Sequence, residues 1–365
     1  MNNNIGHSAL AAAQLLALAL IGTSAFAATV YTETNNAGGN AVQIFSGGAN
    51  GALSLVGSTS TGGLGTSGGL GNQGALALSP DGRWLYAVNA GSDDISVMAV
   101  NAATLSLIDR VPSGGSRPVS LTLHNNLLYV LNAGGSGNIT GFRVAANGHL
   151  NAIAASTRPL SSGVAGAAQV SFDNEGELLV VTEKATNRIS LYEVDDGRAK
   201  GPVSYLSNGM TPFGFAFDRR DTLLVSEAFG GRANASALSS YDIDNDLTAL
   251  DVIDGSVPTA QTAACWVIVA RHGKYAYVTN TGSGSVTGFR IDRSGKLARL
   301  SADGRTGVTG GGPTDGATTR DGKTLFVLAP SIGTIVSFRV RADGSLDNVA
   351  SAPGVAGTAS GLVAW

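Results

Sequence analysis

The sequence has 365 residues, of which 51 are glycine and only 13% are charged, and its formal net charge is −3. Because Lys and Arg form no run or stripe, nucleic acid and anionic lipid are disfavoured as partners, while small neutral or acidic ligands stay open. Cys265 is the only cysteine, so the chain has no internal disulfide and depends on packing for its stability.

The first 27 residues have the features of a targeting segment. An apolar run from Ala9 to Ile21 is too short to span a bilayer, and Ala25-Phe-Ala27 fits a small-x-small cleavage site. We therefore predict that residues 1–27 are a signal peptide cleaved after Ala27, with a periplasmic or secreted product and no membrane span. The residues before the apolar run include no Lys or Arg, so an uncleaved start is the alternative.

The rest of the chain, residues 28–365, repeats a unit of about fifty residues with four short strands. Each unit has an aromatic residue or Met in its third strand, at Phe45, Met98, Phe142, Tyr192, Tyr241, Phe289 and Phe338. The second strands end at Asn35, Asn89, Asn132, Glu183, Glu227, Asn280 and Ala329. This pattern predicts one all-β domain, a seven-bladed β-propeller of four-stranded blades.

Two further features complete the expected ring. The Gly-rich stretch from Gly57 to Gly74 is predicted to be a long loop between blades, since strand alternation resumes at Ala75. Thr29 to Glu33 has the pattern of a second strand, whereas Gly361 to Trp365 has the apolar pattern of an innermost strand. The C-terminal strand should therefore complete the first blade and close the circle.

Several motifs resemble one known family. Tyr277-Val-Thr-Asn280 is a YVTN repeat, and Ser79 to Asn89 and Gly295-Lys-Leu297 resemble the seven-bladed lactonases, which include propeller-type 6-phosphogluconolactonases and fungal carboxymuconate cyclases. Ala263 to Trp266 and Gly209 to Ala216 are similar to an exported bacterial branch. The resemblance implies a hydrolase that opens a sugar lactone or a related lactone. YVTN blades also occur in proteins without catalysis, so a propeller that binds a protein or small ligand is the alternative, followed by a muconate-type cyclase or isomerase.

The sequence departs from this family in its histidines. Relatives that hydrolyse sugar lactones place His in the loops that enter the innermost strands. The corresponding stretches here have none: 72–74, 117–119, 168–169, 212–214, 265–266 and 314–316. His124, His149 and His272 fall instead at predicted hairpin turns, where a surface imidazole is expected.

The loops into the innermost strands and the loops after the second strands share one end face, around the mouth of the central channel. Two adjacent blades end their second strands in Glu183 and Glu227 where other blades have Asn. We predict that one of them is a general base for water attack on a lactone, with Arg117 stabilising the oxyanion. The alternative is that both carboxylates form ion pairs at a solvated rim.

The other candidate residues lie on the same loops and complete the predicted substrate site. Phe213 and Trp266 are expected to form its floor, and Lys184 or Arg232 to share the oxyanion with Arg117. The full set of predicted substrate-binding residues is Lys184, Asn187, Phe213, Arg232, Trp266, Gln73, Gln169 and Asp315. We expect a monomer that acts on a small lactone or organic acid without a cofactor. A calcium ion in the central mouth, held by Glu183, Glu227 and Asn side chains, is the alternative, by analogy with six-bladed lactonases.

Overall fold

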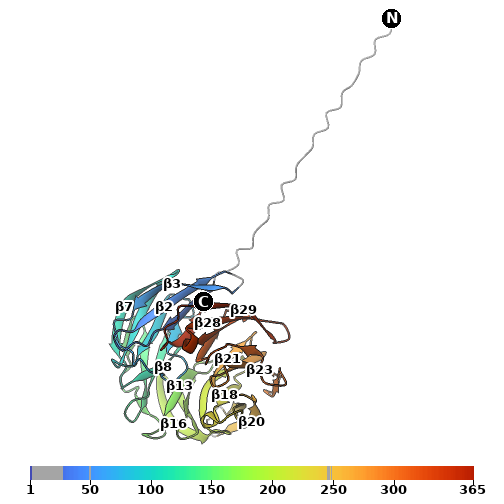
Figure 1. The fold of residues 1–365 in the computed structure, drawn as a ribbon. Coiled ribbons are helices and arrows are strands. Elements are labelled where there is room, and N and C mark those ends of the chain that lie inside the picture. The colour runs from blue at the N-terminus through green and yellow to red at the C-terminus, as the bar shows by residue number, and fades with distance from the viewer. Residues whose placement is uncertain (2–27, 49–50, 245–246, 248) are drawn as a thin grey trace.

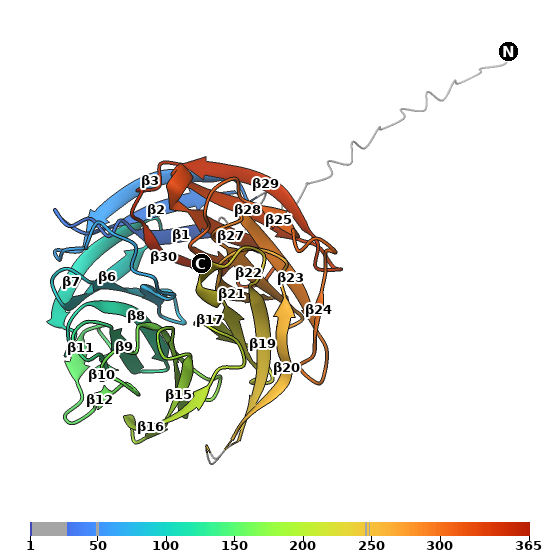
Figure 2. The ribbon, with the colours of Figure 1, turned by 60° about the horizontal axis from the view of Figure 1, so that its bottom comes forward.

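The computed structural model describes residues 1, 28–48, 51–244, 247 and 249–365. The predicted signal peptide, beyond Met1, lies outside the described residues. From residue 28 onward the chain forms a ring of seven antiparallel sheets, so the predicted seven-bladed β-propeller is confirmed (Figures 1 and 2). No helix among the described residues has the length and apolarity needed to cross a bilayer.

The first four blades, each given from its innermost to its outermost strand, have the following bounds. Blade 1 consists of β30 (Ser360–Ala364), β1 (Ala28–Glu33), β2 (Ala41–Gly47) and β3 (Leu53–Ser60). Blade 2 consists of β4 (Leu76–Leu78), β5 (Trp84–Asn89), β6 (Asp94–Asn101) and β7 (Thr104–Pro112). Blade 3 consists of β8 (Pro118–His124), β9 (Leu127–Asn132), β10 (Asn138–Val144) and a split outer strand, β11 (Leu150–Ala152) and β12 (Arg158–Pro159). Blade 4 consists of β13 (Ala167–Phe172), β14 (Leu178–Glu183), β15 (Arg188–Asp195) and β16 (Arg198–Leu206).

The remaining three blades follow the same order. Blade 5 consists of β17 (Pro212–Phe217), β18 (Leu223–Glu227), β19 (Ala237–Ile243) and β20 (Leu250–Pro258), with the 3-10 turn η1 (Phe229–Gly231) after β18. Blade 6 consists of β21 (Ala264–Ala270), β22 (Tyr275–Asn280), β23 (Ser285–Ile291) and a split outer strand, β24 (Leu297–Arg299) and β25 (Gly307–Val308). Blade 7 consists of β26 (Asp315–Thr318), β27 (Thr324–Ala329), β28 (Thr334–Val340) and β29 (Leu346–Pro353), with η2 (Pro330–Ile332) after β27.

The core lies between neighbouring blades. The middle strands are buried on both faces, and for that reason they read as nearly continuous apolar runs such as Leu127–Asn132, LLYVLN. The seven repeated third-strand residues, Phe45, Met98, Phe142, Tyr192, Tyr241, Phe289 and Phe338, are all buried in these interfaces. Each blade thus presents a large side chain to its neighbour, and stability accumulates from one blade to the next around the ring.

The ring closes through the C-terminal strand, as the sequence predicts. β30 pairs antiparallel with β1, with Tyr31 opposite Val363. Thr29 and Trp365 exchange two backbone hydrogen bonds, of 3.0 and 2.8 Å. Figure 2 shows the red β30 beside the blue β1, so the two ends of the chain share one sheet and leave no open edge between the first and last blades.

The ring has two end faces, which differ in how the chain crosses them. The loop face carries the connections after each second strand and those that enter each innermost strand, for example 184–187 and 207–211. The turn face carries the tight turns between first and second strands and between third and fourth strands, for example 79–83 and 292–296. His124, His149 and His272 all lie at the turn face, as predicted.

Candidate functional site at the loop face

The second strand of blade 1 ends two residues earlier than the sequence analysis predicts. β1 ends at Glu33, whereas Asn35 lies beyond it with a φ of 49° and donates from its side chain to the Gly68 carbonyl at 2.7 Å. Three blades therefore place a glutamate at the end of the second strand: Glu33, Glu183 and Glu227. Aligning Tyr31-Thr-Glu33 with Val278-Thr-Asn280 would have identified Glu33 from the sequence.

The predicted solvated rim for Glu183 and Glu227 is wrong, because both side chains are fully buried. Glu183 accepts hydrogen bonds from Ser190 Oγ at 2.8 Å, Thr186 Oγ1 at 2.9 Å and the Ser161 backbone at 3.0 Å, and also from the Ser161 hydroxyl. Each of these donors belongs to blade 4 or to the loop that leads into it. The carboxylate thus ties the incoming loop to its blade.

Glu227 does the same in blade 5. It accepts from the Gly209 backbone at 2.8 Å, Ser239 Oγ at 2.5 Å and Ser256 Oγ at 2.6 Å. A Cβ on Gly209 would approach the Glu227 carboxylate to 2.1 Å, so only glycine lets the loop lie this close. Burial raises the pKa of Glu227, although these hydrogen bonds oppose the shift.

The asparagines of other blades occupy the same structural position. Asn89 donates to Ser96 Oγ at 2.7 Å, and Asn280 donates to Thr287 Oγ1 at 2.9 Å. The glutamates therefore continue a device of the repeat, in which the last polar residue of the second strand is bonded to the third strand. A role for Glu183 or Glu227 as catalytic base stays a prediction.

Part of the chain bonds across the centre of the ring. The Gly-rich loop between blades 1 and 2 turns inward, and its residues 71–74, here called the central segment, bond to innermost strands around the axis. The Asn72 carbonyl accepts from Trp266 Nε1 at 2.5 Å, and the Asn72 side-chain oxygen accepts from Ser360 Oγ at 3.0 Å. The Gly74 carbonyl accepts from the Leu121 backbone at 2.7 Å. These contacts reach blades 1, 3 and 6, so the central segment ties three blades together across the ring.

Three predicted substrate-binding residues form hydrogen bonds with protein backbone in or around the central segment. Gln73 donates to the Val267 carbonyl at 2.9 Å and accepts from the Val267 backbone at 3.1 Å. Gln169 forms the same two-way contact with Phe215, at 3.0 and 2.7 Å, and so bridges blades 4 and 5. Asp315 is buried and accepts from the backbones of Gly316, Gly74 and Leu362, while burial raises its pKa to about 8. The side-chain polar groups of all three residues thus bond to protein backbone.

Three other predicted residues, Lys184, Phe213 and Trp266, do come together beside the central segment. Lys184 follows β14, and its ammonium donates to the carbonyls of Gly71 and, at 3.5 Å, Ala167. The Lys184 nitrogen lies 4.6 Å from the centre of the Phe213 ring, and the rings of Phe213 and Trp266 are 5.0 Å apart. The rings of Phe213 and Trp266 are thus in contact, with Lys184 against Phe213, but both rings are almost fully buried, so their role as a substrate floor stays a prediction.

The surroundings of Lys184 change its acidity. The pKa of Lys184 is lowered to about 8, mainly by burial and in smaller part by the charge of Arg117, against an opposing contribution from Cys265. The Cys265 thiol is itself buried, which raises its pKa to about 11 and keeps it neutral. The result is a cation near the ring axis that titrates close to physiological pH.

The remaining predicted residues lie farther out on the loop face. Arg117 is exposed, on the loop that enters β8, with its backbone N–H bonded to Asp93 at 2.6 Å. Arg232 is exposed and lies over the Phe229 ring at 5.8 Å. Asn187 accepts from the Thr211 backbone at 2.7 Å and so supports the loop into blade 5.

A calcium ion in the central mouth would require several oxygen ligands from the residues around it. No group of three His, Cys, Asp or Glu side chains suited to a metal occurs in the described part of the chain. The oxygens of Glu183 and Glu227 already accept hydrogen bonds from protein donors. The calcium site therefore stays a prediction from analogy.

Comparison with known proteins places this architecture in one family. Residues 30–159 and 233–360, together more than half of the chain, match the family described as lactonase, 7-bladed beta-propeller. The chain belongs to this family. No curated protein matches the sequence.

Solved structures of similar fold include three from bacteria. A candidate 6-phosphogluconolactonase from Bacteroides fragilis is 19% identical, with a TM-score of 0.70 over 94% of this chain and 99% of that one. A second, from Bacteroides uniformis, is 16% identical, with a TM-score of 0.75 over 93% and 99%. The periplasmic gluconolactonase PpgL of Pseudomonas aeruginosa is 16% identical, with a TM-score of 0.71 over 92% and 98%. At these identities the likeness shows a shared fold.

Proposed function

We propose that the protein is an exported hydrolase of small lactones, with its active site on the loop face around Lys184 and Arg117. The observation that carries the proposal is the position of the Lys184 ammonium. It lies near the ring axis, over the Phe213 ring, with a pKa of about 8. Membership of the lactonase family supports the reaction class. The features of residues 1–27 and the periplasmic location of PpgL support export.

The proposed reaction uses cations to stabilise negative charge on the lactone. The carbonyl oxygen lies against the Lys184 ammonium, which has three N–H donors and uses two on Gly71 and Ala167. Water adds to the carbonyl carbon, and the electron pair of the C=O bond moves to the oxygen, which becomes an oxyanion beside Lys184. The oxyanion then re-forms the C=O bond while the bond between the carbonyl carbon and the ring oxygen breaks, and the ring oxygen takes up the proton lost by water. The product is a hydroxy acid.

Arg117 positions the substrate, and the aromatic rings position Lys184. An exposed guanidinium binds hydroxyl, carboxylate or phosphate oxygens with a fixed fork of donors. Phe213 and Trp266 are almost fully buried and packed against each other, so they offer a substrate little surface and instead support the Lys184 ammonium, which lies over the Phe213 ring. The role of Arg117 is to hold the carbonyl against Lys184.

The test is hydrolysis of a panel of sugar lactones, with and without a phosphate group, by the parent protein and by Lys184→Met and Lys184→Arg. We expect Lys184→Met to lower kcat/KM by about 10²–10³-fold, the usual effect of losing an oxyanion donor. Parent activity should decline as the pH rises through about 8, where Lys184 loses its charge. Lys184→Arg keeps the charge and should remove that decline. Full activity of a folded Lys184→Met protein would refute this site.

A specific observation favours a second candidate, a propeller that binds an anionic ligand on the loop face without turnover. The two glutamates proposed as bases are buried and bonded, and the loops around the centre contain no His. In that case the parent protein binds gluconate or 6-phosphogluconate but hydrolyses no lactone of the panel. Lys184→Met would then weaken binding and leave the hydrolysis rate at the uncatalysed level.

A further inference from the structure

A second concave site lies on the turn face, between blades 6 and 7. It has a volume of about 520 Å³, within the usual range for small-ligand sites. We call it the blade 6–7 groove. The charged residues that line it are Arg271, Asp321, Lys323, Arg339, Arg341 and Asp343.

The strand geometry of blade 7 brings the cations of the groove together. Arg339 lies in β28 and Arg341 directly follows it, and both are exposed on either side of the buried Val340. Lys323 adjoins them, because its carbonyl accepts the Val340 N–H at 2.8 Å. Arg271 of blade 6 reaches across and donates to the Val340 carbonyl from Nε at 3.2 Å and from Nη2. Val340 is thus the centre of a cluster built from two blades.

Positive charge exceeds negative charge in this cluster. Lys323 pairs with Asp321 at 3.1 Å and Arg341 with Asp347 at 2.6 Å, and all four side chains are at least one-third exposed. Such exposed pairs are weak and exchange readily for another anion. The carboxylate of Asp343 is held by Ser345 at 2.7 Å. The Arg339 side chain has no hydrogen bond or ion pair with any residue that the structure describes.

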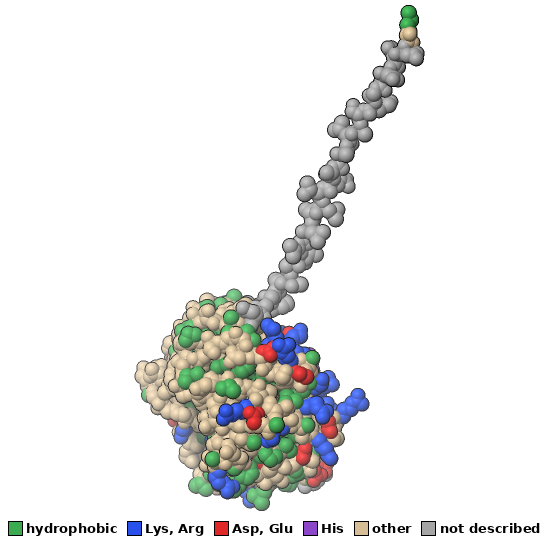
Figure 3. Space-filling view, turned by 45° about the vertical axis from the view of Figure 1, so that its right-hand side comes forward, with side chains coloured by type: hydrophobic (Ala, Val, Ile, Leu, Met, Phe, Trp, Pro, Cys, Tyr) green, Lys and Arg blue, Asp and Glu red, His purple; other side chains and the backbone are tan. Residues whose placement is uncertain are grey.

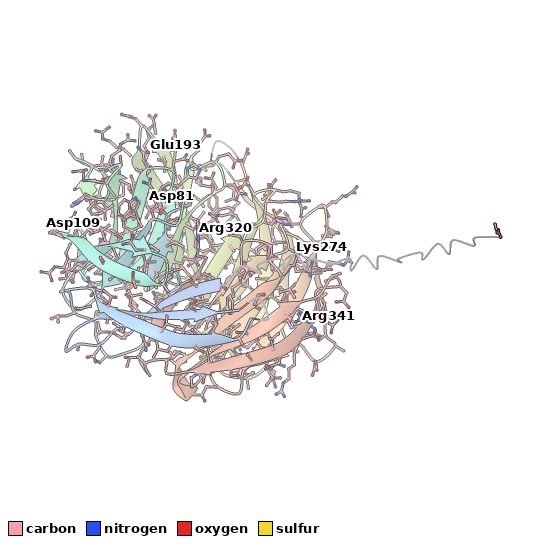
Figure 4. All side chains as sticks on the ribbon, turned by 90° about the horizontal axis from the view of Figure 1, so that it is seen from above. Asp81, Asp109, Glu193, Lys274, Arg320 and Arg341 are labelled. Carbon is pink, nitrogen blue, oxygen red and sulfur yellow. The ribbon has the colours of Figure 1, made fainter. Side chains whose placement is uncertain are left out.

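One more cation lies next to this cluster. Figure 4 shows Lys274 and Arg341 near each other in its view, at one edge of the ring, and Figure 3 shows Lys and Arg side chains mixed with Asp and Glu along one side of the molecule. Lys274 extends the cluster, since its nitrogen lies 3.5 Å from the Ala342 carbonyl.

The equivalent groove between blades 4 and 5 has the opposite charge. Its lining includes Asp173, Glu175, Glu177, Asp221 and Asp242, with Arg220 as its cation. Positive charge is therefore a property of blades 6 and 7 and not of the turn face in general.

We propose that the blade 6–7 groove binds a ligand that carries two or more phosphate groups. Guanidinium groups bind phosphate through paired N–H donors, and the four cations Arg271, Lys323, Arg339 and Arg341 line one groove, so they match a ligand with several phosphate groups. The same chemistry occurs in a soluble polyphosphorylated compound and in the clustered headgroups of an anionic bilayer. The groove lies on the face opposite the proposed hydrolase site, so the outcome of one test does not decide the other proposal.

Titration calorimetry with inorganic phosphate, pyrophosphate and tripolyphosphate tests the proposal on the purified protein. Affinity should increase with the number of phosphates and decrease with added salt. Arg339→Gln is the sharpest variant, because it removes a cation without leaving a carboxylate unpaired. It should weaken tripolyphosphate binding about 10-fold, the effect of one lost charge-assisted contact. Arg305→Gln removes an exposed arginine of blade 6 outside the groove and should bind like the parent.

Co-sedimentation with phosphatidylglycerol vesicles, against phosphatidylcholine vesicles, separates the two sources of phosphate. Binding to phosphatidylglycerol that Arg339→Gln reduces, at concentrations where tripolyphosphate does not bind, assigns the groove to a bilayer surface. Tripolyphosphate binding alone assigns it to a soluble ligand. The proposal is wrong if neither probe binds, or if Arg339→Gln and Arg305→Gln bind both probes equally.

Discussion

The two end faces of the ring are built from the same repeat but differ in chemistry. The tight turns of the turn face need side chains that accept hydrogen bonds from the turn, and aspartates do this. Asp81, for example, accepts from Ser79 Oγ at 2.6 Å and from the Arg83 backbone at 3.1 Å. Basic residues then pair with these carboxylates, as Arg83 does with Asp81. The turn face is charged for local, structural reasons.

The loop face is built by close approach of backbones. Loops converge near the ring axis, and glycine is required where they cover the ends of second strands. At Gly115, for example, a Cβ would come within 2.6 Å of the Asn132 side chain. The loops of this face do not require charged side chains for their structure. Lys184, which lies against the Phe213 ring, is one charged residue that the repeat does not explain. A charged residue on the loop face is therefore better evidence of a functional role than one on the turn face, where the turns themselves require charge.

The largest effect is expected from breaking the ring that separates the two faces. Deleting residues 362–365 removes most of β30, which pairs with β1 and supplies the Leu362 N–H to Asp315. We expect the free energy of unfolding to decrease by more than about 4 kcal/mol, the range of severe single lesions, in urea denaturation. An unchanged midpoint would mean that the first blade is stable without its inner strand.

A smaller loss of stability is expected from the buried glutamates beneath the loop face. Glu227→Ala leaves three donors, from Gly209, Ser239 and Ser256, without their acceptor. We expect a loss of about 2–4 kcal/mol, since a buried unpaired donor costs about 1–3 kcal/mol and the site can partly relax. Glu227→Gln keeps the shape and should lose less.

Activity measurements on the same variants decide the role of these carboxylates. A folded Glu227→Gln or Glu183→Gln protein that loses about 10²-fold or more in lactone turnover would identify a general base. Turnover close to that of the parent would leave Lys184 as the centre of the site.

The pH dependence of stability tests whether the buried Asp315 is protonated in the folded protein. Burial raises the pKa of Asp315 to about 8 in the folded protein, above its usual value near 3.8. Below about pH 4 the carboxyl is protonated in both states and its stabilising contribution is complete. Between about pH 4 and 8 the unfolded chain releases the proton and the folded protein keeps it, so stability decreases as the pH rises. Asp315→Asn should flatten this decrease in denaturation midpoints measured from pH 4 to 8, and an identical slope would show that Asp315 is ionised when folded.

The sequence predicts the fold better than the site because the repeat is local and the site is not. The third-strand positions from Phe45 to Phe338 recur about every fifty residues, so strand order and ring closure follow from the pattern. The central segment cannot be predicted in this way, because Asn72 and Gln73 bond to Trp266 and Val267, nearly two hundred residues away. The blade 6–7 groove is hidden for the same reason, since Arg271 and Arg339 form no run in the sequence.

The smallest effect is expected from the histidines, and it bears directly on the contrast between the faces. His149 pairs with Asp109 at 2.9 Å, His124 lies 5.9 Å from the Phe172 ring, and His272 is exposed in a turn. All three lie on the turn face, across the ring from Lys184. Replacing them together by Asn should leave lactone hydrolysis within about 3-fold of the parent, because no positioned acid or base, typically worth about 10² or more, is removed. Stability should decrease by less than about 1 kcal/mol for the exposed His149 pair. A large loss of turnover in a variant with a normal unfolding midpoint would move the active site to the turn face, and the charges there would then require a functional explanation.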